Sequence, residues 1–205
     1  MYKNFGKRFL DVFFSSLGLI VAAPVFLIVP VLIKFDSPGA VFFTQKRMGR
    51  GGRAFQLIKF RSMCSDKENE KKGFEPGSAL RVTKIGKILR KTKLDEIPQL
   101  INVFMGDMSL VGPRPEVEQY KNFYTGEFAP VLSVRPGITD LASIKYRHEE
   151  EILARSSDPQ KTYKEVILPD KLQIALSYVQ NNIRFTGDIY IIIQTLLSIQ
   201  KRVRQ

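Results

Sequence analysis

The sequence predicts an α+β fold: a membrane helix at the N-terminus, then one domain of amphipathic helices and a small β-hairpin. Three observations predict it: an uncharged run of 22 residues, a glycine-rich turn between two short strands, and apolar residues at helical spacing in otherwise basic segments. The 205 residues are 44% hydrophobic and 25% charged, which suits a folded domain and excludes a disordered chain. We expect residues 1–36 to form a basic flank and the membrane helix, and residues 37–205 to form a cytoplasmic interfacial domain.

Basic residues dominate the chain: 32 Lys and Arg stand against 20 Asp and Glu, a net charge of +12. Almost all of the excess lies between Lys34 and Lys93, where 16 basic residues face 5 acids. Such a balance indicates an anionic partner: nucleic acid, anionic lipid or a phosphorylated substrate. One cysteine and one histidine exclude a disulfide framework and a cysteine zinc cluster, and a catalytic triad could be built only around His148.

The uncharged run extends from Val12 to Ile33 and, as a helix, would be about 33 Å long, enough to cross the hydrocarbon core of a bilayer. Lysines and arginines flank it on both sides, so the positive-inside rule places both flanks on the cytoplasmic side. Pro24, near its middle, removes a helix hydrogen bond and bends the axis, and Pro30 predicts a second break. The residues alone fit either a re-entrant helix that turns back at Pro24 or a kinked single-pass anchor.

Two short segments rich in phenylalanine and β-branched residues, Val41–Lys46 and Phe55–Arg61, predict strands. The glycines of the intervening segment, Met48–Gly52, are those that a hairpin loop needs. After a charged loop, Ser65–Gly77, apolar residues recur at helical spacing from Val82 to Leu89 among lysines and arginines. This spacing predicts a basic amphipathic helix suited to a membrane surface.

The C-terminal segment predicts one more helix. Apolar residues follow helical spacing from Ile189 to Leu197, with Asp188 as the N-cap and basic residues at the far end. Because Tyr190 and Ile191 make the opposite face apolar as well, we expect this helix to pack in the domain or to lie on the membrane.

Asp95 and Glu96 are adjacent carboxylates at the start of a predicted helix whose first turn contains Pro98. A helix N-terminus favours acidic residues for its own stability, and this explains most such pairs. Here, however, the cationic run Arg90–Lys93 precedes them, and cations beside a helix N-terminus attract phosphate. In that setting two carboxylates can bind Mg²⁺ or attack phosphorus as a nucleophile.

Two arginines stand directly before proline. Arg114 lies between Pro113 and Pro115, so a stiff backbone presents its guanidinium, which matches phosphate with paired donors. Twenty-one residues later, Arg135 and Pro136 repeat the arrangement. One Arg-Pro pair is usually a loop feature, whereas two of them downstream of an Asp-Glu pair indicate phosphate chemistry.

Taken in order, motifs over essentially the whole chain resemble the bacterial sugar transferase family, specifically its small monotopic phosphoglycosyl transferases. The matching stretches are Lys7–Asp11, the segment around Pro24, Phe43–Gln45, Lys59–Met63, Leu94–Val103, Gly106–Ser109, Gly112–Pro115 and Arg135–Thr139. The resemblance implies a re-entrant membrane helix broken at Pro24 and an active site at the cytoplasmic face of the bacterial inner membrane. It also implies Asp95 as nucleophile, Glu96 beside it as a catalytic and metal-binding residue, and a requirement for Mg²⁺.

The implied reaction transfers a sugar 1-phosphate from a UDP-sugar to polyprenyl phosphate and releases UMP, through a phosphosugar ester of Asp95. It would be the first membrane step in the assembly of a bacterial glycan. Basic side chains would neutralise the transferring phosphate; the candidates are Lys59, Arg61, Arg90, Arg114 and Arg135. Besides the two substrates, the expected partners are anionic lipid of the inner leaflet and, as an allowed state, a second copy in a homodimer, but no nucleic acid.

A rival interpretation is a membrane-anchored basic protein that binds anionic lipid or nucleic acid without catalysis. It leaves both Arg-Pro motifs unexplained, and the sequence carries no nucleic-acid signature. Two positions also depart from the family pattern. Ala23 replaces the serine that usually precedes the membrane proline, so another group must satisfy the carbonyl that Pro24 frees. Asp140 replaces the glycine that usually follows the Arg-Pro-Gly-Ile-Thr motif, in a loop expected near the sugar.

Overall fold

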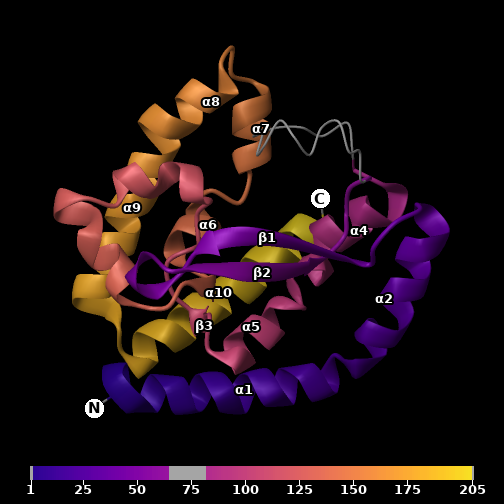
Figure 1. Cartoon of the computed structure of the whole chain (residues 1–205), viewed down its shortest axis with the longest axis horizontal. Coiled ribbons are helices and arrows are strands. Elements are labelled where there is room, and N and C mark those ends of the chain that lie inside the picture. The colour runs from indigo at the N-terminus through magenta and orange to yellow at the C-terminus, as the bar shows by residue number, and fades with distance from the viewer. Residues whose placement is uncertain (1, 65–81, 205) are drawn as a thin grey trace.

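The computed structural model describes residues 2–64 and 82–204 as a mixed helical and β-sheet structure, as the sequence predicts (Figure 1). The charged loop predicted from Ser65 to Gly77 lies outside the described residues. Helices α1 (Lys7–Val21) and α2 (Ala23–Asp36) run along one side and up one end of the molecule (Figure 1). A hairpin crosses the front, and helices of the C-terminal half gather at the other end and behind the hairpin.

The two N-terminal helices meet at Ala22 with a bend of 58°. In the described part of the chain no single helix is long and apolar enough to cross a bilayer, although this bent pair passes the same test of length and composition. The bend predicted at Pro24 is therefore confirmed. The carbonyl of Ile20 would ordinarily accept from the N–H that Pro24 lacks. The N–H of Ala22, which donates to Gly18 O (2.8 Å), is directed toward this carbonyl as well.

The predicted second break at Pro30 is wrong, because α2 continues through this residue to Asp36. A proline inside a helix removes one backbone hydrogen bond, and here the bonds of the neighbouring turns keep the helix continuous.

The burial pattern of α1 is inverted relative to a helix of a soluble protein. Its buried residues are Asp11 and Ser15, and Oδ1 of Asp11 accepts hydrogen bonds from Ser109 Oγ (3.0 Å) and the Leu110 amide (2.9 Å). Nine apolar side chains of α1 and α2 are 48–87% exposed; they are Phe9, Phe13, Leu17, Ile20, Val21, Leu27, Ile28, Val31 and Phe35. Lys34, near the end of α2, is exposed as well. A polar inner face and an apolar outer face are typical of a helix in contact with lipid.

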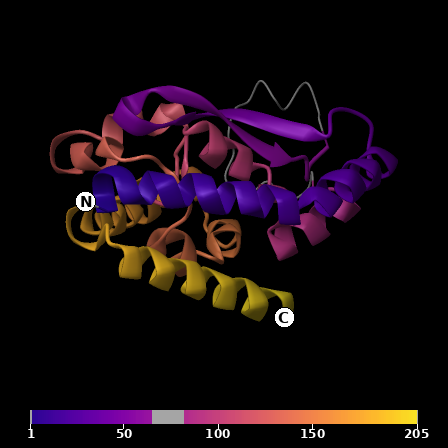
Figure 2. The same ribbon diagram turned by 90° about the horizontal axis from the view of Figure 1, so that it is seen from below.

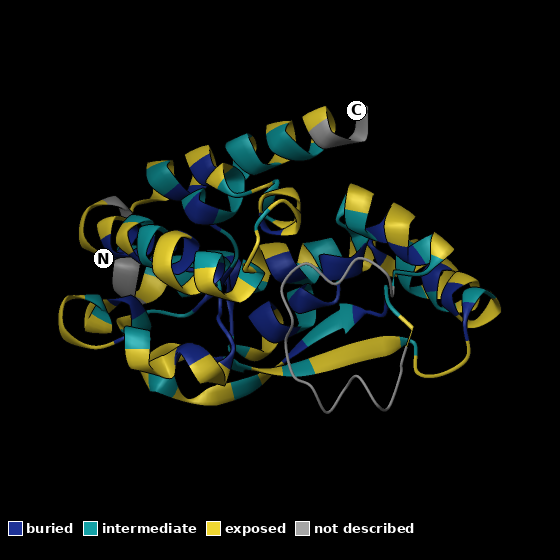
Figure 3. Ribbon diagram, turned by 90° about the horizontal axis from the view of Figure 1, so that it is seen from above, coloured by how far each residue is buried: buried dark blue, intermediate teal, exposed yellow. Residues whose placement is uncertain are grey.

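The predicted hairpin is confirmed. Strands β1 (Phe42–Met48) and β2 (Ala54–Phe60) pair antiparallel, with Phe42 opposite Phe60. In the turn, Gly51 and Gly52 have φ values of 68° and 72°, which side chains other than glycine rarely adopt. Strand β1 is mostly exposed, whereas β2 faces the domain (Figure 3).

The predicted basic amphipathic helix is α4 (Lys84–Thr92), with Leu89 buried and Ile88 58% exposed. A 3₁₀ turn, η4 (Leu94–Glu96), and the short helix α5 (Gln99–Met105) follow. The helix predicted to begin at the acidic pair therefore begins three residues after it, and the pair lies in the turn.

A second, parallel pair of strands joins the two Arg-Pro motifs and is not predicted by the sequence. It consists of β3 (Ser109–Val111) and β4 (Gly137–Thr139). A Cβ atom on Gly137 would lie 2.1 Å from the nitrogen of Gly112, and one on Gly112 would lie 2.6 Å from the carbonyl oxygen of Arg135. Both motifs therefore need glycine next to the strand, because the two backbones approach too closely for a side chain.

The C-terminal half supplies most of the core. Its helical segments are η5 (Glu118–Phe123), η6 (Gly126–Ser133), α6 (Leu141–Lys145), α7 (Glu149–Ala154), α8 (Pro159–Thr162), η7 (Tyr163–Ile167), α9 (Leu168–Ser177), η8 (Tyr178–Asn182) and α10 (Phe185–Arg204). Leu168, Leu172 and Leu176 of α9 pack in one buried cluster with Tyr120 and Tyr163. Helix α9 thus buries leucines, as a helix of a soluble domain does.

The predicted N-cap at Asp188 is wrong, because α10 already begins at Phe185. Asp188 is buried in the first turn, where it accepts hydrogen bonds from Tyr2 (2.6 Å) and Tyr178 (2.7 Å) and pairs with Lys7. Its partners come from the N-terminus and from η8, so they are not visible in the local sequence.

Helix α10 packs in the domain on one side and leaves an apolar face on the other. Ile191 is 2% exposed, whereas Ile193 and Leu196 are 50% and 62% exposed. Seen from below, α1 runs across the middle of the molecule, between the hairpin and α10 (Figure 2).

Candidate active site

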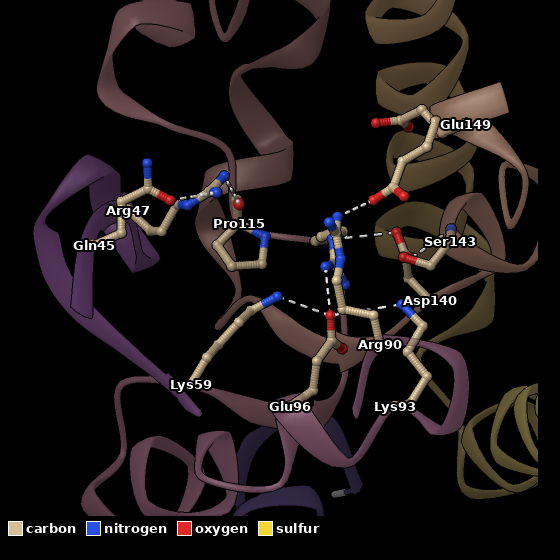
Figure 4. Close-up of polar contacts among 12 residues, drawn as sticks. Gln45, Arg47, Lys59, Arg90, Lys93, Glu96, Pro115, Asp140, Ser143 and Glu149 are labelled. Carbon is tan, nitrogen blue, oxygen red and sulfur yellow. Dashed lines mark hydrogen bonds and ion pairs between the residues drawn. The ribbon is translucent and has the colours of Figure 1, made fainter. Parts of the chain in front are cut away.

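A cluster of charged side chains surrounds Glu96. Its Oε1 accepts hydrogen bonds from Lys59 Nζ (2.8 Å) and Arg114 Nη2 (2.9 Å), and Lys93 Nζ lies 3.7 Å away. Lys59 and Lys93 approach the carboxylate from opposite sides (Figure 4). Burial alone would raise the pKa of Glu96, but the charges of Arg114, Lys59 and Lys93 hold that pKa well below its usual value. Glu96 is therefore an anion in this cluster.

Three segments that are distant in the sequence build the cluster. Lys59 comes from β2, Glu96 from the turn η4, and Arg114 from the loop after β3. Lys93, between α4 and η4, has a φ of 61° and is the one non-glycine residue with positive φ in the described part of the chain. This conformation costs about 1–2 kcal/mol, and it reverses the chain so that Lys93 and Glu96 meet.

Asp95 is buried beside this cluster with an unused oxygen. The residue is 7% exposed, and within the described ranges its Oδ1 has no hydrogen-bond partner. Burial raises the pKa of Asp95, the charge of Lys59 opposes this rise, and the charge of Glu96 adds to it. The adjacent carboxylates therefore differ: Glu96 is held by three cations, whereas Asp95 keeps a desolvated oxygen with no hydrogen-bond partner among the described residues.

Asp140 holds the backbone of Arg114. Its Oδ2 accepts a hydrogen bond from the Arg114 amide (3.3 Å), and its Oδ1 accepts one from the Ser143 amide (2.8 Å), which caps helix α6. The charge of Glu96 and, more weakly, that of Asp140 raise the pKa of Arg114, although burial lowers it. Asp140, a departure from the family pattern, thus fixes the loop that presents Arg114 and does so from a buried position.

Lys93, Glu96 and Arg114 of the cluster line a cavity of about 350 Å³. Charged residues of the segment from Tyr146 to Glu150 also line it, together with Lys171. Isoleucine and leucine side chains from α5, β4, α6 and α10 contribute apolar lining; they are Leu100, Ile138, Ile144 and Ile199. The cavity therefore offers charge for a phosphate group and apolar surface for the remainder of a ligand.

The structure brings together four of the predicted site residues: Lys59, Asp95, Glu96 and Arg114. Arg90 lies nearby and pairs with Glu150, which lines the cavity.

Two predicted phosphate-binding arginines lie elsewhere. Arg61 is 6% exposed and donates to the carbonyl oxygens of Ser37 (2.6 Å) and Pro38 (2.7 Å), so it fastens the end of α2 to the hairpin. Arg135 donates through Nε to the Gly106 carbonyl (2.7 Å) and lines a different cavity.

Sequence reasoning missed Lys93 and Asp140 as members of the site. Lys93 belongs to the cationic run before the acidic pair, and its distance of three residues from Glu96 was a usable signal for an ion pair. Asp140 followed by Ser143 carries an N-cap signal, but its bond to Arg114 depends on the parallel pair β3–β4, which the sequence does not reveal.

The site can be tested for the Mg²⁺ that the family resemblance implies. Among the described residues no three Asp, Glu, His or Cys side chains gather into a metal site. Mg²⁺ is, however, commonly held by one or two carboxylates together with substrate phosphates. The unpartnered Oδ1 of Asp95 and the carboxylate of Glu96 are oxygen donors of that kind, so the residues present fit such an ion.

Comparison with known proteins shows which family this chain resembles. The model of the family described as bacterial sugar transferase matches residues 2–202. A UDP-N-acetylgalactosamine-undecaprenyl-phosphate N-acetylgalactosaminephosphotransferase of Aeromonas hydrophila is 41% identical over 143 residues, which are 68% of this chain and 34% of the relative. A UDP-glucose:undecaprenyl-phosphate glucose-1-phosphate transferase of Caulobacter vibrioides is 42% identical over 143 residues, 68% of this chain and 53% of the relative.

A third relative is matched over most of its length. The exopolysaccharide production protein ExoY of Rhizobium meliloti is 37% identical over 164 residues, which are 73% of this chain and 73% of the relative. The chain thus spans about a third and about half of the first two relatives, and nearly three quarters of the third.

Proposed function

The chain belongs to the bacterial sugar transferase family, and from that premise we propose that it transfers a sugar 1-phosphate from a UDP-sugar to undecaprenyl phosphate and releases UMP. The two transferase names among the relatives share this acceptor and differ in the sugar. One observation carries the proposal: a buried carboxylate with an unpartnered oxygen, Asp95, lies next to an anion that three cations hold and that lines a cavity.

In the first step, an oxygen of Asp95 attacks the phosphorus that bears the sugar. A bond forms between that oxygen and phosphorus, and the bond from phosphorus to the bridging oxygen breaks, so UMP leaves with the electron pair. Arg114 and Lys59 lie where they can balance charge on the transferring phosphoryl group. Glu96 holds both cations in place; its charge raises the pKa of Arg114 and opposes the lowering of the Lys59 pKa by burial.

In the second step, a phosphate oxygen of the acceptor attacks the same phosphorus. The bond to Asp95 breaks, its carboxylate is restored, and the product is an undecaprenyl diphosphate sugar. Two steps through a carboxylate avoid bringing two polyanions together in a single displacement.

Mg²⁺ belongs to this proposal as a bound cofactor. Asp95 and Glu96 would hold it together with diphosphate oxygens of the substrate, and it would supply neutralisation of the charge that develops on the departing UMP. The side chains of Arg114, Lys59 and Lys93 would orient the remaining phosphate oxygens.

We further propose that the bent pair α1–α2 enters the cytoplasmic leaflet of the bacterial inner membrane and returns. The 58° bend and the apolar outer surface of both helices support this arrangement. In a Cys64→Ser background, Lys3→Cys and Lys46→Cys should both react with an impermeant thiol reagent from the cytoplasmic side. Reaction of Lys3→Cys from the opposite side would instead mean a single-pass anchor.

The proposed reaction is tested by measuring UMP release from UDP-N-acetylgalactosamine, UDP-glucose and other UDP-sugars, with and without undecaprenyl phosphate. We expect one or a few donors to give UMP in proportion to the acceptor added. A chain that binds anionic vesicles but releases no UMP from any donor would be a membrane-anchored binding protein and would contradict the proposal.

A further inference from the structure

Arg135 is the feature of the sequence that the proposed reaction leaves unused. It lines a second cavity, of about 240 Å³, that shares no lining residue with the first. Four basic residues line this cavity: Lys7, Arg8, Arg50 and Arg135. The other polar residues that line it are Asp11, Ser109, Ser133 and Tyr178. We propose that this second cavity binds a phosphate group, and that its natural source is the headgroup of a membrane lipid.

The arginines come from three separate parts of the chain, and backbone carbonyls hold each of them. Arg8, in the first turn of α1, donates to Val103 O (2.6 Å) and Phe104 O (3.0 Å). Arg50, in the hairpin turn, donates through Nε to Ser133 O (3.0 Å), and Arg135 donates through Nε to Gly106 O (2.7 Å). A guanidinium has five N–H donors, so these anchors position the groups and leave donors for a ligand.

The charge of these arginines is not balanced locally. Within the described ranges no carboxylate oxygen lies within 4.0 Å of a nitrogen of Arg8, Arg50 or Arg135. Burial lowers the pKa of Arg135, the charges of Arg8 and Arg50 lower it further, and the charge of Asp11 opposes them more weakly. Asp11 is the one acid among the described residues that line the cavity, and its Oδ1 already accepts two hydrogen bonds.

A purely structural role accounts for only part of this arrangement. Arg8 and Arg135 satisfy carbonyls at the C-terminal end of α5, a common use of basic side chains. That role needs neither Arg50 nor a cavity in which three guanidinium groups repel one another. A phosphate group, with several oxygens and up to two negative charges, meets planar guanidinium donors and removes the repulsion.

The position of the second cavity favours a lipid as the source. Lys7, Arg8 and Asp11 of the first turns of α1 line it, and the outer surface of the same turns carries the exposed Phe9 and Phe13. A lipid with its acyl chains beside these rings could place its phosphate in the cavity. Inorganic phosphate offers the same chemistry, so the two sources must be separated by experiment. The proposal does not depend on the transfer reaction.

The test uses the full-length protein and two probes. The first is inorganic phosphate, followed by isothermal titration; the second is flotation with phosphatidylcholine vesicles, with and without phosphatidic acid. We expect Arg50→Gln and Arg135→Gln each to reduce the gain in binding due to phosphatidic acid by about tenfold, the effect of losing one charge-assisted hydrogen bond. Arg53→Gln removes the same charge from the same turn without touching the cavity, and should change the gain by less than about twofold.

Arg135→Lys controls for folding, because lysine keeps the charge and can still donate to the Gly106 carbonyl, although it lacks the planar guanidinium. The gain in binding due to phosphatidic acid should be smaller for Arg135→Lys than for wild type and larger than for Arg135→Gln. If the Arg50→Gln and Arg135→Gln variants bind phosphatidic acid vesicles less well than wild type, the lipid is a ligand of the cavity. If only their binding of inorganic phosphate is reduced, the ligand of the same cavity is soluble. Equal losses for Arg53→Gln and Arg50→Gln, or no binding of either probe to the wild-type chain, would overturn the proposal.

Discussion

Arg114 and Arg135 each precede a proline, and the parallel pair β3–β4 brings their two loops side by side. Their guanidinium groups nevertheless serve different cavities. Arg114 pairs with a carboxylate, Glu96, whereas Arg135 shares its cavity with two arginines that repel it. The Arg-Pro motif therefore restrains the backbone at the arginine, and the neighbouring elements determine which groups its side chain contacts. In our proposals the first cavity serves the transfer reaction and the second binds an anion.

The largest effect expected from this comparison concerns the metal. Chelation by EDTA should abolish UMP release, and added Mg²⁺ should restore it, because the charge that develops on the departing UMP needs a hard cation held by carboxylate oxygens. Phosphate or vesicle binding by the second cavity should persist in EDTA, since it relies on arginines alone. Full UMP release in EDTA would contradict a role for Mg²⁺ in the first cavity.

The next effect separates the two arginines. Arg114→Lys should reduce UMP release about a hundredfold, because an ammonium group cannot reproduce the paired donors of a guanidinium beside the transferring phosphate. Arg135→Lys, measured in detergent so that membrane binding plays no part, should lower the same rate by less than about threefold. An equal reduction of UMP release in both variants would mean that the two loops act on one substrate. It would contradict separate roles for the two cavities.

A smaller effect is expected at Asp140, which links the Arg114 loop to helix α6. Asp140→Ala removes an N-cap and should lower the free energy of unfolding by about 1 kcal/mol, whereas Asp140→Asn keeps a capping oxygen and should lose less. Denaturant unfolding of the detergent-solubilised protein would measure both. If Asp140→Ala left stability unchanged while UMP release fell, Asp140 would contact the substrate rather than support the loop.

The sequence predicts those parts of the molecule whose cause is local. The hairpin follows from two short apolar strands around glycines, the basic helix α4 from its periodicity, and the bend between α1 and α2 from Pro24. The resemblance to a family places Asp95 and Arg114 in one site. In the structure Arg114 lines the first cavity, and Asp95 lies next to Glu96, which also lines it.

What the sequence does not predict depends on contacts between distant segments. Asp188 looks like an N-cap, but tyrosines from two other elements bury it within α10. Arg61 looks like a phosphate ligand, yet the carbonyl groups that end α2 occupy it. The left-handed conformation of Lys93 has no signal in its residue type, because glycine and asparagine are the residues that usually adopt it.

The central claim is that Asp95 carries the sugar phosphate between donor and acceptor. It is tested most directly by mass spectrometry of the protein after incubation with its UDP-sugar and Mg²⁺, without undecaprenyl phosphate. We expect an added mass of one sugar phosphate on the peptide that contains Asp95, removed by hydroxylamine and absent from Asp95→Asn, with Glu96→Gln retaining some of it. An adduct on Asp95→Asn but not on Glu96→Gln would reverse the roles of the two carboxylates. Normal turnover with no adduct on any variant would mean that the acceptor phosphate attacks the donor directly, and would contradict the claim.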